Sequence, residues 1–498
     1  MDQTTKRKIL VAVFLTLGAI VFIAGIIGAV YAIRETPTDV TSVGELRSAT
    51  RGILSGILHK EVKNNETAIK TVELFAFAYF PELLVIGAIF LAAGILIILS
   101  EDKNKAVRIK KVTSVLKDRT MLIALVIVYL FFTDMTAGRL FSPSNFSALI
   151  NQNTYVFILG TGMLMCMLTG GNIDLSCGAV VCLLGAIGGV FMSAQAMAMG
   201  TGVSILLMML IGIGYGVLLG FLIAYVHIPP WIATLTGFLA FRGLGTEILN
   251  KASPETKSLT NFPDSFKSIF YGRVFSTPEG VFNWPCFIFG LLGASIVFAT
   301  VFVTRKNRLA KGYEADSMKA AAAKSGISAA AIILLTYELA WGGGIPTALL
   351  WAAGIVLIYS FITSKTTIGR HFYVVGSNME AARLSGVNTR RIMFLAYLNM
   401  AVLTSIATMS NMARFGNAFA DAGKNYEMDA ISACVVGGVS ASGGSGSVLG
   451  MVIGATLIGV INLGMSLIKL DQNYQRVVKG AVLLAAVVFD ILSKKRSK

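Results

Sequence analysis

Three side chains that can hydrogen-bond a polar molecule lie inside an otherwise apolar part of the chain. Asn172, Asp174 and Ser176 belong to a glycine-containing stretch, 170–178, with apolar sequence on both sides. An amide, a carboxylate and a hydroxyl are costly at membrane depth when they face lipid, which offers no hydrogen-bonding partner. We therefore expect them to line a polar path or to lie within protein. The alternative for Asp174 is that it caps a helix beginning near Ser176.

A second glycine-rich break occupies residues 437–446, and two further carboxylates, Glu427 and Asp429, precede it. Two hydrophobic segments interrupted by glycine, one in each half of a chain, are typical of a transport pathway built from broken helices. We expect the two carboxylates at the mouth of the second break, where they contact the solute or cap a helix. The competing interpretation is that both breaks are ordinary loops and small-residue packing sites.

Neither covalent catalysis nor metal binding is indicated by the sequence. The five cysteines form no CxxC pair, the three histidines are scattered, and no nucleophile, base and orienting group occur at a recognisable spacing. Residues 438–443 have the glycine spacing of a phosphate loop, but Gly444 stands where the phosphate-binding lysine belongs. We predict no catalytic residue, no metal site and no cofactor in this chain.

The composition is that of an all-α polytopic membrane protein. Of the 498 residues, 55% are hydrophobic and 14% are charged, and the mean hydropathy is +0.74. The net charge of +16 comes from short basic stretches between apolar runs. We interpret these stretches as cytoplasmic topology signals in contact with membrane lipid, and not as a nucleic-acid surface.

Residues 1–117 are predicted to form an N-terminal extension. Two apolar runs, 9–31 and 72–99, are long enough to cross a membrane, and basic residues before the first run place the N-terminus in the cytoplasm. The first run is too long for a cleaved signal peptide. The basic residues of 103–117 complete the extension as a cytoplasmic linker.

Residues 118–498 are predicted to form a bundle of about 12 transmembrane helices, with several runs short enough to be broken or re-entrant. Basic residues place 305–311, 365–391 and the C-terminus in the cytoplasm, whereas the charge-balanced loop 245–283 is expected outside. The apolar runs are 121–135, 155–169, 176–195, 204–226, 231–244, 285–304, 327–341, 347–363, 392–412, 429–440, 448–468 and 478–492.

Small residues recur at helical spacing in two of these runs. Gly212, Gly216 and Gly220 share one helix face, and Gly450 and Gly454 share another. Such faces let helix backbones approach closely, so we expect them to hold the bundle together.

One cytoplasmic segment predicts a short helix at the membrane face. Glu380 to Leu384 favour a helix, Asn378 is placed to cap it, and Gly386 stands where the C-terminal cap belongs. A short, charged helix that ends sharply is suited to docking into a groove of another protein.

Here the sequence resembles a known family. Glu380, Ala381 and Ala382 followed by Gly386 match the EAAxxxG pattern of permease subunits of bacterial ABC importers. The usual continuation, Ile-x-Leu-Pro, is absent, and the string 369–386 is similar to the sugar-permease branch, closest to permeases for xylose and for multiple monosaccharides, in the ribose and galactose permease superfamily.

Four further blocks agree with that branch, in the same order. Residues 173–176 resemble its Ile-Asp-Leu-Ser signature, although Cys177 replaces the usual Val. Residues 229–235 resemble its Pro-x-Phe-Ile-x-Thr-Leu block with Trp231 for Phe, and 427–438 and 478–480 match two later blocks.

The resemblance implies the ABC importer permease fold and a set of partners. These are a second copy of the chain, a cytoplasmic ATP-binding subunit of the tandem-cassette kind, which binds the ATP, and an extracytoplasmic sugar-binding protein. It implies import of a monosaccharide of the xylose, arabinose, galactose or glucose class across a bacterial inner membrane. Glu380, Ala381, Ala382 and Gly386 would couple to the ATPase.

Two other functions stay open at this point. One keeps the mechanism and changes the cargo to a nucleoside or another small polar solute. The other is an ion-coupled secondary transporter, which needs titratable groups within the membrane; Asp174 and Glu338 are the candidates.

Overall fold

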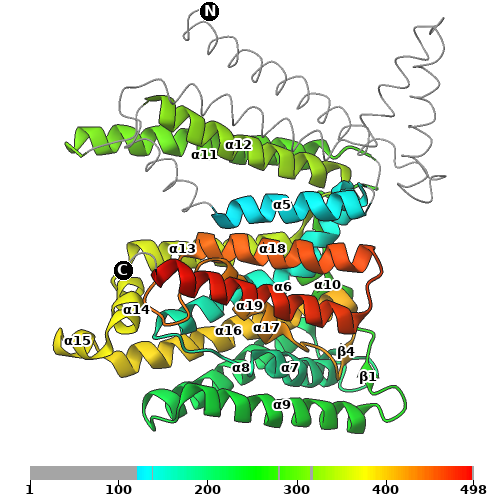
Figure 1. Cartoon of the computed structure of the whole chain (residues 1–498). Coiled ribbons are helices and arrows are strands. Elements are labelled where there is room, and N and C mark those ends of the chain that lie inside the picture. The colour runs from blue at the N-terminus through cyan, green and yellow to red at the C-terminus, as the bar shows by residue number, and fades with distance from the viewer. Residues whose placement is uncertain (1–119, 137, 279–280, 314–317, 496–498) are drawn as a thin grey trace, which may run out of the picture. The chain divides into compact units, whose positions relative to one another are not determined.

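The computed structural model shows a predominantly helical chain (Figure 1). By its internal contacts the chain divides into two compact units. The two helices and the linker predicted for residues 1–117 lie outside the described residues. The structure describes residues 120–136, 138–278, 281–313 and 318–495. The described parts of the two units are 120–145 with 460–475, and 146–459 with 476–495.

The first unit is the smaller one. It contains α5 (Thr120–Met135), the 3-10 turn η1 (Arg139–Phe141) and the last residues of α18 (Val448–Leu467). The Phe132 ring occupies the place that a side chain on Gly464 would fill. The missing side chain therefore lets α5 and α18 pack closely.

The second unit is helical apart from two short strand pairs. β1 (Ser258–Leu259) pairs antiparallel with β4 (Ala418–Phe419), and β2 (Arg273–Val274) with β3 (Ile345–Pro346). Its helices are α6 (Pro143–Leu168), α7 (Cys177–Met192), α8 (Thr201–Ala224), α9 (Pro230–Ala252), α10 (Asp264–Tyr271), α11 (Trp284–Ala310), α12 (Met318–Trp341), α13 (Thr347–Lys365), α14 (Thr367–Ser377), α15 (Met379–Leu384), α16 (Thr389–Phe415), α17 (Tyr426–Val436), most of α18 and most of α19 (Gln472–Lys495).

Six helices of the described chain, α8, α9, α11, α13, α16 and α18, are long and apolar enough to cross a membrane. The prediction of an all-α polytopic membrane protein is therefore confirmed. The run predicted at 429–440 differs, because α17 has only 11 residues. Such a helix rises about 16 Å, half of an apolar layer about 30 Å thick. α17 is thus too short to cross this layer. α7, with 16 residues and a rise of about 24 Å, is too short as well, and both are called half-helices below.

The glycine face of α8 packs against α16, as the sequence predicts. A β-carbon on Gly216 would lie 2.5 Å from the β-carbon of Ala401, and one on Gly212 would collide with the Ser405 side chain. Gly454, on the second predicted face, lies against the carbonyl oxygen of Ala433 in α17. Both faces therefore bring helix backbones together.

Replacing Gly216 by Leu should destabilise the bundle, because the new side chain cannot fit between α8 and α16. We expect a loss of about 1–3 kcal/mol, the usual effect of overpacking. Gly214→Leu is the matched control, since a β-carbon there meets nothing within 4 Å. Thermal unfolding of both variants in detergent would measure the difference, and equal midpoints would contradict the packing described.

Candidate functional site

α7 and α17 begin at the same place in the second unit. α7 starts at Cys177 and α17 at Tyr426. The Glu427 carboxylate, in the first turn of α17, lies against Gly178 so closely that a β-carbon on Gly178 would collide with it. The amino ends of α7 and α17 therefore meet at this glycine.

From this meeting point the two helices run to opposite ends of the unit. α7 ends beside the β1–β4 pair, where Gly189 lies against Leu259 and Ala418. α17 ends at the 437–446 turn, where Gly437 lies against Gly450 of α18. Two half-helices that begin together and diverge are the arrangement found where a broken-helix pathway crosses a membrane.

Asp174 stabilises the turn that leads into α7. Its Oδ1 accepts the backbone N–H of Ser176 at 2.8 Å and also the Ser176 hydroxyl. The Tyr215 hydroxyl of α8 bonds to the Ser176 hydroxyl and lies 3.5 Å from Oδ2 of Asp174. Asp174 and Ser176 are at most 1% exposed. Asp174 therefore closes the turn before α7 through Ser176, the residue that precedes the helix, and its role as a helix cap stays a prediction.

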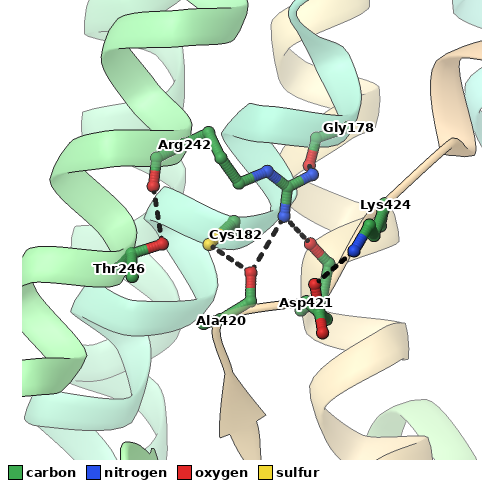
Figure 2. A network of polar contacts seen from close by, with 8 residues as sticks. Gly178, Cys182, Arg242, Thr246, Ala420, Asp421 and Lys424 are labelled. Atoms are coloured by element: carbon green, nitrogen blue, oxygen red, sulfur yellow. Dashed lines mark hydrogen bonds and ion pairs between the residues drawn. The ribbon is translucent and has the colours of Figure 1, made fainter.

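Arg242 joins the two broken segments (Figure 2). Its Nη1 donates to the carbonyl oxygens of Ala420 at 3.0 Å and Ala422 at 2.6 Å, and its Nη2 donates to that of Gly178 at 3.2 Å. Charge-assisted hydrogen bonds of this kind are among the strongest in proteins. A guanidinium on α9 thus ties the first turn of α7 to the non-helical segment 416–425.

Asp429 is the buried member of an ion pair whose lysine is partly exposed. It is 3% exposed; its Oδ1 lies 3.0 Å from Nζ of Lys479 in α19, and the Tyr155 hydroxyl of α6 donates to its Oδ2 at 2.5 Å. The Tyr155 ring stacks on Tyr426 with ring centroids 3.6 Å apart. These contacts hold the amino end of α17 between α6 and α19.

The predicted position of Glu427 and Asp429 at the mouth of the 437–446 break is wrong. Both lie in the first turn of α17, so the helix separates them from Gly437 by its length. The physical reason is that the chain has a further interruption before the glycine-rich one. This is the non-helical segment 416–425 between α16 and α17.

The two glycine-rich stretches nevertheless contact each other. Gly171 lies against the carbonyl oxygen of Ala441, and Gly443 against the backbone of Gly170. Gly170, Gly171 and Gly443 also have positive φ values, a conformation that favours glycine. Asn172, close by in the chain, donates to the carbonyl oxygen of Thr169 at 2.9 Å and so closes the end of α6.

The predicted short helix is present as α15. Asn378 accepts the backbone N–H of Ala381 at 3.0 Å, and Gly386 has φ +85°, so both predicted caps are confirmed. Ala382 is buried, whereas Ala381, Gly386 and the ion pair Glu380–Arg383 are exposed. α15 therefore presents a charged surface while Ala382 anchors it.

α14 connects this helix to both glycine-rich stretches. A β-carbon on Gly376 would collide with the carbonyl oxygen of Leu168, at the end of α6. The Tyr373 hydroxyl donates to the carbonyl oxygen of Gly446 at 3.0 Å. A displacement of α14 must therefore reach the first break and the 437–446 turn together.

Four partners in this site were not predicted: Tyr155, Tyr215, Arg242 and Lys479. A usable signal exists for Arg242, because a cation inside the apolar run 231–244 is expensive unless it has a function. The other three pair with acidic or hydroxyl groups far away in the sequence. Their spacing gives no sign of the contacts.

Taken together, the spans, the paired half-helices and the capped helix at one end define a multi-pass membrane permease. Residues 145–487 match the family described as branched-chain amino acid transport system / permease component, and the chain belongs to this family. No solved structure matches the chain.

Curated relatives agree with this assignment. The chain is 33% identical over 382 residues to the xylose transport system permease protein XylH of Haemophilus influenzae, which covers 76% of this chain and 96% of that protein. It is 28% identical over 376 residues to the ribose import permease protein RbsC of Escherichia coli K12, which covers 75% and 94%.

Removal of one member of the Asp429–Lys479 pair should destabilise the protein more than removal of both. Lys479→Met leaves a buried carboxylate without its cation, which costs about 3–5 kcal/mol. The double variant Lys479→Met, Asp429→Asn should recover most of this loss. Thermal midpoints of the single and double variants in detergent would decide, and a double variant less stable than Lys479→Met would rule out the pairing as the cause.

Proposed function

We propose that this chain is the membrane-spanning subunit of an ATP-driven importer of monosaccharides of the xylose, arabinose, galactose or glucose class. The similarity to the xylose and ribose permeases supports the cargo class. The observation that carries the mechanism is the continuous contact from α15 through α14 to both glycine-rich stretches.

The remaining parts of the importer belong to other chains. An ATP-binding subunit docks on α15 from the cytoplasm, and a sugar-binding protein delivers the cargo at the opposite membrane face. A second copy of this chain completes the path, and both termini lie in the cytoplasm. Asn172, Asp174, Ser176, Glu427 and Asp429 border this path, where Asp174 and Asp429 act chiefly by holding the two half-helices.

ATP binding in the partner would move α15, and α14 would transmit the movement. Gly376 against Leu168 and Tyr373 on Gly446 pass it to the two stretches that hold the half-helices. The path would then open alternately to each side of the membrane.

The cargo is tested by uptake in vesicles that contain this chain with the ATPase and the sugar-binding protein encoded beside it. A panel of labelled xylose, arabinose, galactose, glucose and uridine separates the sugar class from the nucleoside class. We expect ATP-dependent accumulation of at least one monosaccharide and none of uridine. Accumulation of uridine alone would refute the proposed cargo.

Substitutions in α15 should uncouple transport without preventing membrane insertion. Glu380→Lys reverses an exposed charge, and Gly386→Val places a β-branched residue at a left-handed backbone position. We expect sugar uptake and recovery of the ATPase with the purified permease to fall about tenfold, as when a hot-spot contact is lost.

The control for these variants is Lys365→Ala, which removes another exposed charge near α14. It should keep normal uptake and normal ATPase recovery. Normal uptake in the Glu380→Lys and Gly386→Val variants would show that α15 is not the coupling element.

A further inference from the structure

Arg242 is a cation that donates hydrogen bonds to three carbonyl oxygens in the described part of the chain. Its guanidinium is half-buried and contacts Gly178, Ala420 and Ala422 (Figure 2). Carbonyl dipoles compensate a cation less completely than a carboxylate does. The arrangement therefore holds a charge that can still gain from an anionic partner.

Such a partner lies on the other side of the same glycine. The Glu427 side chain is 4% exposed, and its Oε2 has no hydrogen-bond partner among the described residues. This carboxylate packs against Gly178, whose carbonyl oxygen accepts from Arg242. A buried carboxylate oxygen without a donor is costly, and such atoms in a native fold call for an explanation.

We propose that Arg242 and Glu427 form a latch that alternates during the transport cycle, an inference that rests on the proposed function. In the state seen here the guanidinium holds Ala420 and Ala422 against the first turn of α7. In the opposite-facing state it leaves these carbonyl oxygens and pairs with Glu427. In each state either the two carbonyl oxygens or the Glu427 carboxylate lacks the guanidinium as a partner. The two states are therefore close in energy.

The thiol of Cys182 can report this movement. Cys182 in α7 is 1% exposed, and its thiol donates to the carbonyl oxygen of Ala420 at 3.3 Å, the same oxygen that accepts from Arg242. When Arg242 leaves the carbonyl oxygen of Ala420, the Cys182 thiol becomes accessible to reagents. Arg242 is accordingly a positioning residue, and Cys182 should react only when Arg242 is not bonded to Ala420.

The test measures the reaction of Cys182 with a small methanethiosulfonate reagent in the full importer in vesicles. The other four cysteines are replaced by Ala so that one thiol remains. Arg242→Gln should raise the labelling rate without ATP by about tenfold, the effect of losing one charge-assisted hydrogen bond. The control Lys424→Gln removes a neighbouring exposed cation that pairs with Asp421 and should leave the rate unchanged.

The Glu427→Gln variant distinguishes movement of the latch from a general loosening of the fold as the cause of labelling. In the state seen here the Oε2 of Glu427 has no hydrogen-bond partner among the residues that the structure describes, so labelling without ATP should equal that of the parent. The rise in labelling that ATP produces in the parent should be lost, because the second position of Arg242 is gone.

The proposal is overturned if Arg242→Gln labels at the parent rate, if Lys424→Gln labels as fast as Arg242→Gln, or if Glu427→Gln keeps the full ATP-driven rise. Sugar uptake by the parent complex is measured in the same vesicles. If the labelling rates are as expected but no sugar is taken up, the proposed cargo is wrong and the latch stands. If sugar uptake is normal but the Cys182 labelling rate does not change among the variants, only the latch is wrong.

Discussion

The structure depends on one constraint: a backbone that is broken inside an apolar layer must find its hydrogen-bond partners within the protein. The chain is interrupted at 170–176 and at 416–425, and the amino ends of α7 and α17 meet between these interruptions. Arg242 satisfies carbonyl oxygens on both sides of the meeting point. Asp174 satisfies the N–H of Ser176 at the entrance to α7. These bonds supply hydrogen-bond partners where the chain is interrupted.

The same constraint explains the different surroundings of the two carboxylates of α17. Asp429 is held by Lys479 and Tyr155, so the amino end of α17 is fixed to α6 and α19. Glu427, two residues earlier, faces α7, and one of its oxygens has no donor within the described ranges of the chain. One carboxylate therefore anchors the half-helix, and the other faces the boundary at which the two broken segments separate.

The sequence predicts local features of this architecture well. The first break, the Asn378 cap of α15 and the glycine face of α8 depend on residues close together in the chain, and their physical signals are local. The second break lies where its glycines indicate, at 437–446, but the further interruption at 416–425 contains fewer glycines and was not predicted, so Glu427 and Asp429 were placed at the wrong end of α17. The Tyr155–Asp429 bond joins residues 274 positions apart, which no local pattern reveals.

The contacts also bear on the source of energy. Asp174 and Asp429 hold structural hydrogen bonds to Ser176, Tyr155 and Lys479, a use that differs from a chain of groups that pass a proton. The exposed charges of α15 lie where a separate protein can reach them. Under the function proposed above, this chain supplies the path and a partner supplies the energy.

The most direct test measures monosaccharide accumulation in vesicles that contain this permease alone or together with its ATPase and sugar-binding protein. The account predicts accumulation only in the complete system with ATP on the ATPase side, and no accumulation by the permease alone under an imposed proton gradient. Accumulation against a concentration gradient by the permease alone would contradict it.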